Sequence, residues 1–228
     1  MNPIDPSANS SSASNSPTLL HPALHISRHP LVRHKLGHLR GTATSSPVFR
    51  ALVRELAALL AYEATADLAL RPVQVTTPMS ATTGEEMAES VALVPVLRAG
   101  LGMVEGAWQL IPNAPVWHLG LFRNEETLAP VSYYNKLPLE LTAAVCLLLD
   151  PMLATGGSAI AAASMLKAAG ARRIKYVGII GAPEGVRRMA EVHPDIAVHL
   201  GALDERLNDV GYIVPGLGDA GDRMFGTR

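Results

Sequence analysis

Apolar side chains recur every three or four residues between Val48 and Leu60, which is the spacing of one face of an α-helix. Ser46 and Pro47 stand just before this stripe, in the cap and first-turn positions that these residue types favour. The pattern therefore predicts a long amphipathic helix that begins at Pro47, with Ser46 as its cap.

Short apolar runs of strand length follow in the rest of the chain, at residues 91–97, 116–121, 144–149, 174–180 and, more weakly, 196–202. Segments with a helical pattern separate most of them, at residues 102–110, 158–169 and 183–191. This alternation predicts an α/β fold, a mostly parallel sheet with helices on both faces. Pro95 cannot donate a hydrogen bond to a neighbouring strand, so the first strand is expected to stop near Val94. Residues 82–84 are expected in a loop.

A sheet of this kind binds ligands at the carboxyl ends of its strands, where the connecting loops gather. The loops after the first, third and fourth runs cover residues 98–100, 150–158 and 181–185, and each is polar or rich in Gly. The sequence therefore predicts a ligand site along this edge of the sheet.

Composition narrows the class of protein. The 228 residues, 48% of them hydrophobic, suffice for one domain, which we assign to residues 26–228. Residues 1–25 are rich in Ser, Asn and Pro and are expected to form a disordered tail without the apolar core of a signal peptide. A net charge of −1 argues against nucleic acid or a membrane as partner, and we expect a cytoplasmic protein.

Cys146 lies in an apolar run and is expected to be a small buried side chain.

A Gly-rich turn follows the third run, where the chain leaves a strand at Asp150 and enters a helical segment at Ser158. The unpaired N–H groups of such a helix start bind a phosphate monoester, and the hydroxyls of Thr155 and Ser158 add donors. No Lys follows the glycines, so this is not a Walker loop. The glycines alone fit an ordinary turn capped by Ser158 equally well. Asp150 favours a ligand, because a carboxylate at this place suits the hydroxyls of a ribose.

The run from Asp150 to Ser158 resembles the phosphoribosyl pyrophosphate (PRPP) motif of type I phosphoribosyltransferases, in a form similar to that of the uracil phosphoribosyltransferase family. The resemblance covers about residues 27–228. Most of the superfamily has two adjacent acids here, whereas Pro151 replaces the second one, as in the uracil branch, so ribose binding is expected to rest on Asp150. The PRPP-binding residues that the resemblance implies in this loop are Asp150, Pro151, Met152, Leu153, Ala154, Thr155, Gly156, Gly157 and Ser158.

Two other segments resemble parts of this family that hold pyrophosphate. Residues 94–102 resemble its pyrophosphate loop, where Arg98 and nearby amides are implied to hold the leaving group and where related enzymes often have a strained non-proline peptide. Residues 122–140 resemble its flexible arm, and Arg123 is implied to contact pyrophosphate. A surface ion pair is the alternative reading of Arg98, and a solvated hairpin is the alternative for the arm.

Residues 211–223 resemble the most family-specific segment, the uracil-binding hood, which spans about residues 204–228. A Gly-rich backbone can read uracil with its own amides and carbonyls and reject cytosine. The implied uracil contacts are Ile213, Gly218, Asp219 and Ala220. Asp219 is also implied to contact PRPP, and Asp150 and Asp219 are the implied catalytic residues.

The same tail satisfies a dinucleotide-binding pattern with Gly216, Gly218 and Gly221. Only seven residues follow the last of these glycines, which leaves no room for the helix and second strand that such a site requires. A dinucleotide site is therefore rejected.

The resemblance implies an enzyme that transfers the phosphoribosyl group of PRPP to N1 of uracil, giving UMP and diphosphate. Mg²⁺ is expected to arrive on the PRPP, since no His, Cys or acid cluster has metal-ligand spacing and no metal ligand is assigned to the chain. The family suggests a homodimer or larger homo-oligomer and leaves open GTP as an effector.

The residues alone leave three alternative functions open. A phosphoribosyltransferase for another base and a sugar-phosphate-binding structural module both leave the Gly-rich tail unexplained. A non-catalytic regulator that senses nucleotides or binds RNA should have a basic face and altered residues at Arg98 or Asp219, neither of which the sequence shows.

Overall fold

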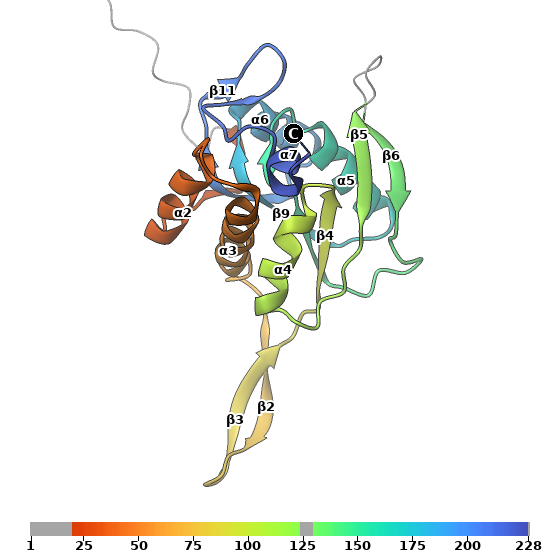
Figure 1. The fold of residues 1–228 in the computed structure, drawn as a ribbon. Helices are drawn as coiled ribbons and strands as arrows, with labels where there is room; N and C mark the ends of the chain where they lie inside the picture. The colour runs from red at the N-terminus through yellow and green to blue at the C-terminus, as the bar shows by residue number, and fades with distance from the viewer. Residues whose placement is uncertain (1–19, 124–129, 228) are drawn as a thin grey trace, which may run out of the picture.

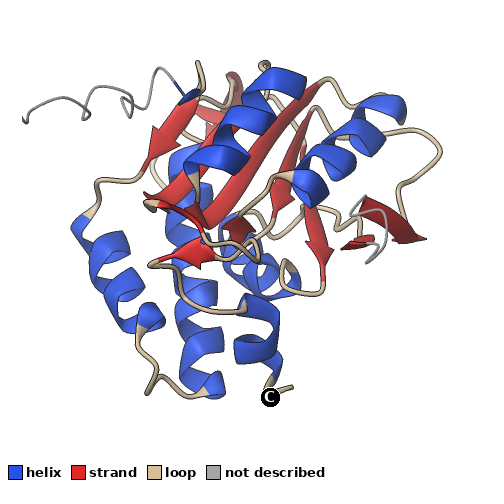
Figure 2. Ribbon diagram, turned by 90° about the horizontal axis from the view of Figure 1, so that it is seen from above, coloured by secondary structure: helices blue, strands red, loops and turns tan. Residues whose placement is uncertain are grey.

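The computed structural model describes residues 20–123 and 130–227, which form a central β-sheet covered by helices (Figures 1 and 2). From one edge to the other, the sheet runs through β1 (Leu24–Ile26), β10 (Ala197–Leu203), β9 (Arg173–Gly181), β7 (Val145–Leu149), β4 (Val91–Leu97), β5 (Leu119–Arg123) and β6 (Pro130–Asn135). Neighbouring strands on this path are parallel except for β5 and β6. The predicted α/β class with a mostly parallel sheet is confirmed.

Two layers of helices bury the two faces of the sheet (Figure 2). One layer contains α2 (Pro30–Arg40), α3 (Ser46–Ala64), α4 (Leu101–Leu110) and α7 (Ala220–Phe225), and the other contains α5 (Gly157–Ala168) and α6 (Pro183–Val192). Side chains of β7 alternate between the layers: Leu147 and Leu149 pack in the first, Cys146 and Leu148 in the second. Cys146 is 1% exposed, so its prediction as a small buried side chain is confirmed.

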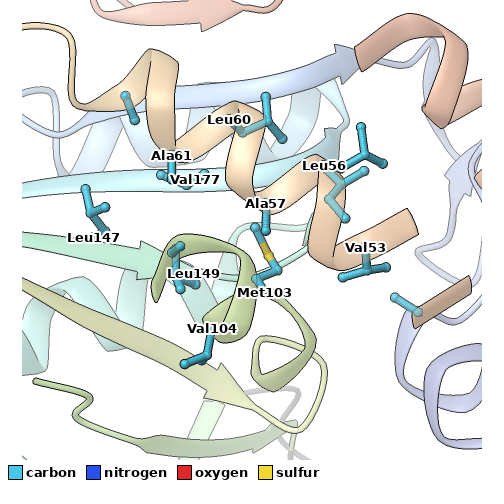
Figure 3. Packing of buried hydrophobic residues seen from close by; sticks show 14 of the residues in the cluster. Val53, Leu56, Ala57, Leu60, Ala61, Met103, Val104, Leu147, Leu149 and Val177 are labelled. Carbon is cyan, nitrogen blue, oxygen red and sulfur yellow. The ribbon is translucent and has the colours of Figure 1, made fainter. Parts of the chain in front are cut away.

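Helix α3 is the centre of the first layer. In Figure 3 its buried face, which includes Ala57 and Leu60, packs with Met103 of α4 and Val177 of β9. The helix starts at Ser46, so the predicted helix is confirmed, but its cap is Ser45 and not Ser46. This packing fixes α4, which begins directly after the loop that follows β4, and so helps to place that loop.

Residues 70–87 form a hairpin that stands away from the body of the domain (Figure 1). Within the described chain its strands, β2 (Leu70–Thr76) and β3 (Ala81–Met87), pair only with each other. The loop expected at residues 82–84 is wrong, because they lie inside β3, where Thr82 and Thr83 have the branched side chains that favour strands. A second small sheet joins β11 (Arg206–Leu207) and β12 (Ile213–Val214).

Strand β4 passes through Pro95 and continues to residue 97, so the end expected near Val94 is wrong. Leu93 makes both of its backbone hydrogen bonds with the segment that leads into β5. Alternate residues of a strand face the same neighbour, so the missing N–H of Pro95 faces that side too. Pairing with β5 resumes only at Val96. The proline therefore lies at a gap in the ladder and breaks no hydrogen bond.

The tail expected over residues 1–25 ends earlier than expected. Leu20 is 4% exposed and packs in the second hydrophobic cluster, and His21 is also buried. Leu24 begins β1, which pairs in parallel with β10 at the sheet edge. The boundary between residues 25 and 26 is corrected accordingly, because residues 20–25 already bury side chains in the domain. Residues 1–19 lie outside the described residues.

Candidate active site

Three loops that lie far apart in the sequence line one pocket of about 240 Å³, beyond the carboxyl ends of β4 and β7. Its lining residues are Arg98, Ala99, Asp150, Pro151, Met152, Ala154, Asp219, Ala220 and Gly221. These residues belong to the segments interpreted above as the pyrophosphate loop, the phosphate loop and the hood. The structure thus brings Arg98 and Asp150 to one place, as the sequence predicts for loops at the carboxyl ends of parallel strands, together with Asp219 of the hood.

The phosphate loop leaves β7 at Asp150 and forms a two-residue strand, β8 (Met152–Leu153), which pairs with β9. The chain then turns at Gly156, whose φ of 78° is a left-handed conformation that favours Gly. Gly156 is the N-cap of α5, so the reading of Ser158 as cap is wrong, and Ser158 lies in the first turn. Its hydroxyl and the N–H groups of that turn are therefore placed where a phosphate would bind.

The Asp150 carboxyl lines the pocket and is partly buried. Desolvation raises its pKa to about 7, and a long hydrogen bond of 3.5 Å from the Met152 N–H to Oδ1 acts weakly in the other direction. The hydroxyl of the buried Tyr176 donates to the backbone oxygen of Asp150 at 2.9 Å, which fixes the peptide unit. A carboxyl poised near neutral pH is a common property of functional sites.

Arg98 follows β4 directly, and the peptide bond between Leu97 and Arg98 is cis. Its side chain is 57% exposed and lies 3.6 Å from Asp222 and 5.8 Å from the ring centre of Phe225, both on α7. An exposed contact of this length contributes little free energy. The guanidinium can therefore turn from Asp222 to a diphosphate, which it can bind with two parallel hydrogen bonds.

The hood includes β11, β12, α7 and the turn that leads into α7. Asp219 is the N-cap of α7, and its Oδ1 accepts a hydrogen bond of 2.8 Å from the Asp222 N–H. Ala220 is buried and lines the pocket beside Asp219. Gly218 and Asp219 also line a neighbouring hollow of about 450 Å³.

Some predicted site residues of the described chain do not line this pocket: Leu153, Thr155, Gly156, Gly157, Ser158, Ile213 and Gly218. Ile213 is 6% exposed and its side chain packs in the hydrophobic core, so any contact with a base would come from its main chain. Arg123 ends β5, but its side chain lies outside the described residues, as do residues 124–129 of the arm. The pyrophosphate contact of Arg123 stays a prediction.

Sequence reasoning missed Arg188 of α6. Its Nη1 donates to the backbone oxygen of Thr155 at 3.4 Å and lies 4.0 Å from the place that a Cβ on Gly157 would occupy. The signal in the sequence is a cation on the helix that follows the Gly-rich loop 181–185, at the same edge of the sheet as the phosphate loop. Arg188 thus adds positive charge beside the first turn of α5.

A comparison with known families decides what kind of site this is. The family model described as uracil phosphoribosyltransferase matches residues 26–227. The chain belongs to the uracil phosphoribosyltransferase family. A curated uracil phosphoribosyltransferase of Roseiflexus castenholzii is 60% identical over 202 residues, which is 89% of this chain and 97% of the relative. Another, of Acholeplasma laidlawii, is 50% identical over 203 residues, 89% of this chain and 98% of the relative.

A solved structure supports the fold of this uracil phosphoribosyltransferase family member. The AQ2163 protein from Aquifex aeolicus has a TM-score of 0.84 and 42% identity, over 89% of this chain and 97% of the other. In residues 20–123 and 130–227, no group of three or more His, Cys, Asp and Glu side chains could hold a metal ion. None of the helices in the same residues is both long and apolar enough to span a bilayer.

Proposed function

We propose that the chain transfers the 5-phosphoribosyl group of PRPP to N1 of uracil, giving UMP and diphosphate. The observation that carries the proposal is the single pocket at which the loops of Arg98, Asp150 and Asp219 meet. A base, a ribose phosphate and a diphosphate need three different kinds of contact, and each loop offers one of them. Membership of the uracil phosphoribosyltransferase family assigns the chemistry.

The proposed residue roles are those that the family resemblance implies, and the positions of Arg98 and Asp150 in the pocket support them. Arg98 and Arg123 hold the diphosphate, and the ribose hydroxyls donate to Asp150. The first turn of α5, from Thr155 to Ser158, binds the 5-phosphate with N–H groups and hydroxyls.

The hood reads the base with Ile213, Gly218, Asp219 and Ala220, of which Asp219 also contacts PRPP. Main-chain amides and carbonyls present a fixed pattern of donors and acceptors. A base whose pattern differs at one edge leaves a buried group unpaired, which is the basis of rejection.

In the reaction, N1 of uracil loses its proton and forms a bond to the anomeric carbon of the ribose, while the bond from that carbon to the diphosphate oxygen breaks. Positive charge develops on the ribose ring in the transition state, as in glycosyl transfer generally. The ionised Asp150 carboxylate stabilises that charge, and the three loops hold the reacting atoms in line.

Magnesium is part of the proposal as an ion that enters on the PRPP. Asp150 and Asp219 are the carboxylates that line the pocket, a donor set that suits an ion bound mainly through substrate oxygens and water. When bound, the ion would neutralise charge on the departing diphosphate.

The working form is proposed to be a cytoplasmic homodimer or larger homo-oligomer. The hairpin of β2 and β3 exposes Leu70, Val75, Met79 and Met87, with Met79 93% exposed. An isolated two-stranded hairpin is only marginally stable in water, so packing against a second copy would stabilise it. Sedimentation of the full chain should give a mass at least twice that of one chain, and a monomer at assay concentration would contradict this. Adding GTP to the assay tests whether it is an effector.

Base competition tests the proposed activity. The full chain is mixed with labelled PRPP, Mg²⁺ and equal amounts of uracil, cytosine, adenine and hypoxanthine. We expect label in UMP and none in the other nucleotides. Label in another nucleotide would overturn the base assignment, and label in none would overturn the activity.

A further inference from the structure

Two arginines tie the base-reading segment of the hood to the carboxyl end of helix α2. Arg40 is the last residue of α2, and Arg223 lies on α7. We infer that Arg40, together with its partner Asp204, and Arg223 are positioning residues that hold the backbone of residues 216–218 in the conformation that reads uracil. The inference rests on the proposed function, because it assumes that this backbone contacts the base.

The first tie binds both backbone groups of one residue, Gly216. The Arg40 guanidinium donates from Nη2 to Asp204 Oδ1 at 2.5 Å and from Nη1 to Asp204 Oδ2 at 2.7 Å. The same Nη1 donates to the Gly216 carbonyl oxygen at 2.6 Å, and the Gly216 N–H donates to Asp204 Oδ2 at 2.9 Å. Both backbone groups of Gly216 are therefore bound by a partly buried ion pair, in which the Asp204 side chain is 4% exposed and the Arg40 side chain 24%.

The second tie acts on the next residue. Arg223 Nη1 donates to the Leu217 oxygen at 2.7 Å and to the Leu39 oxygen at 2.9 Å, and Nη2 donates to the Gly41 oxygen at 2.5 Å. Carbonyl groups at a helix carboxyl end lack partners within the helix and attract cations. The guanidinium also lies 4.5 Å from the ring centre of the buried Phe49. One side chain thus fastens Leu217 to the end of α2.

The turn at residues 216–218 requires glycine at two positions. Gly216 has a φ of 64°, and a Cβ at this position would lie 2.0 Å from the Ile213 oxygen. Gly218 also has a positive φ, of 80°. Because this segment reads a base with main-chain groups, no side-chain rotation can correct a shift of the backbone. A misplacement of about 1 Å can cost on the order of 100-fold in rate.

A purely structural role is the alternative to positioning. Buried ion pairs are weak evidence for stability, since the cost of removing two charges from water offsets much of their attraction. A structural role would lower the stability of the fold and affect both substrates alike. A positioning role would act on uracil, because Arg40, Asp204 and Arg223 bind the backbone of residues 216–217 and none of them lines the pocket at the phosphate loop.

The test is the variant Arg40→Lys, which keeps the charge but cannot bind two carboxylate oxygens and a carbonyl with one planar fork. Arg33→Lys is the matched control, the same substitution at an exposed position of the same helix. We expect Arg40→Lys to raise KM for uracil by about tenfold or more and to change KM for PRPP by less than about twofold. The control should change neither. Equal effects on both KM values, or no effect on KM for uracil, would overturn the inference.

Hydrogen exchange of the backbone amides separates this inference from the proposed function. If the wild-type chain forms no UMP from uracil, the proposed function fails. The backbone amides of residues 213–218 should still exchange their hydrogens faster in Arg40→Lys than in Arg33→Lys. Equal exchange in the two variants would overturn the positioning claim itself. Asp204→Asn is a second variant, with the same shape and an oxygen that can still accept from Gly216. Failure of both Arg40→Lys and Asp204→Asn to fold, while Arg33→Lys folds, would show a structural role and overturn the inference.

Discussion

Replacing Asp150 by Asn removes one charge from the pocket and keeps the shape of the side chain. We expect the fold to persist and kcat to fall by roughly 10² to 10³, the scale for losing one preorganised electrostatic contact. The reason is that only the carboxylate can accept hydrogen bonds from both ribose hydroxyls and also stabilise positive charge on the ring. The assay is UMP formation at saturating uracil and PRPP.

The pH dependence gives a second magnitude for the same residue. With a pKa of about 7 in the free protein, Asp150 is ionised to about 10% at pH 6 and about 90% at pH 8. The wild-type kcat/KM for PRPP should therefore rise about tenfold over this interval. Ionisation of the substrate affects the wild type and Asp150→Asn equally. The additional rise from the Asp150 carboxylate should therefore appear only in the wild type.

The free energy of unfolding should fall as pH rises, in contrast to kcat/KM. The folded pKa lies above the unfolded value of 3.8, so the folded state holds the proton more tightly. The associated stabilisation is complete below pH 4 and is lost as pH rises through 7, with an upper limit of about 4 kcal/mol. The Tm of the wild type should thus fall relative to that of Asp150→Asn between pH 5 and 8.

Asp209→Asn, at an exposed position, is the matched control and should preserve turnover and both pH trends. Near-normal turnover of Asp150→Asn would remove Asp150 from the mechanism. An identical dependence of Tm on pH in the wild type and the Asn variant would refute the claim that this carboxyl titrates near pH 7.

Other residues give shorter tests. Arg98→Lys keeps the charge but loses the planar guanidinium, so KM for PRPP should rise by about tenfold. An unchanged KM would support the alternative interpretation of Arg98 as a surface ion pair. Arg188→Ala should raise KM for PRPP by a few-fold and leave KM for uracil unchanged. The control is Arg187→Ala, at the exposed neighbouring position, and an equal rise of KM for PRPP in both variants would exclude a phosphate contact of Arg188. Burial raises the pKa of Cys146 to about 11, so a thiol reagent should react only after unfolding, and fast reaction of the native chain would contradict its burial.

Periodicity in the sequence predicted the elements that bury apolar residues. The runs at 91–97 and 174–180 became β4 and β9 almost without change, because fully buried strands have unbroken apolar stretches. The hairpin of β2 and β3 was missed because it packs on no face of the domain and so has no buried side to set a pattern. The strand end expected near Val94 was wrong for a different reason. The effect of Pro95 depends on which neighbouring strand its missing N–H faces, and the sequence does not show this.

The candidate site was predictable where local sequence determines local structure. Asp150, Gly156 and Arg98 lie in loops that their own residue types mark as strand exits and helix starts. Arg40, Asp204 and Arg223 could not be predicted, because residues 164 positions apart in the chain, such as Arg40 and Asp204, meet only after the sheet has formed. Arg188 was missed for a similar reason, since its neighbour Thr155 lies 33 positions away.

The central claim is that one pocket joins PRPP and uracil. The most direct measurement is the quantity of UMP and of diphosphate formed when the purified full chain is given uracil, PRPP and Mg²⁺. The account predicts equal amounts of the two products, with neither formed when uracil is omitted. Diphosphate released without UMP, or no product from uracil under conditions where another base reacts, would contradict it.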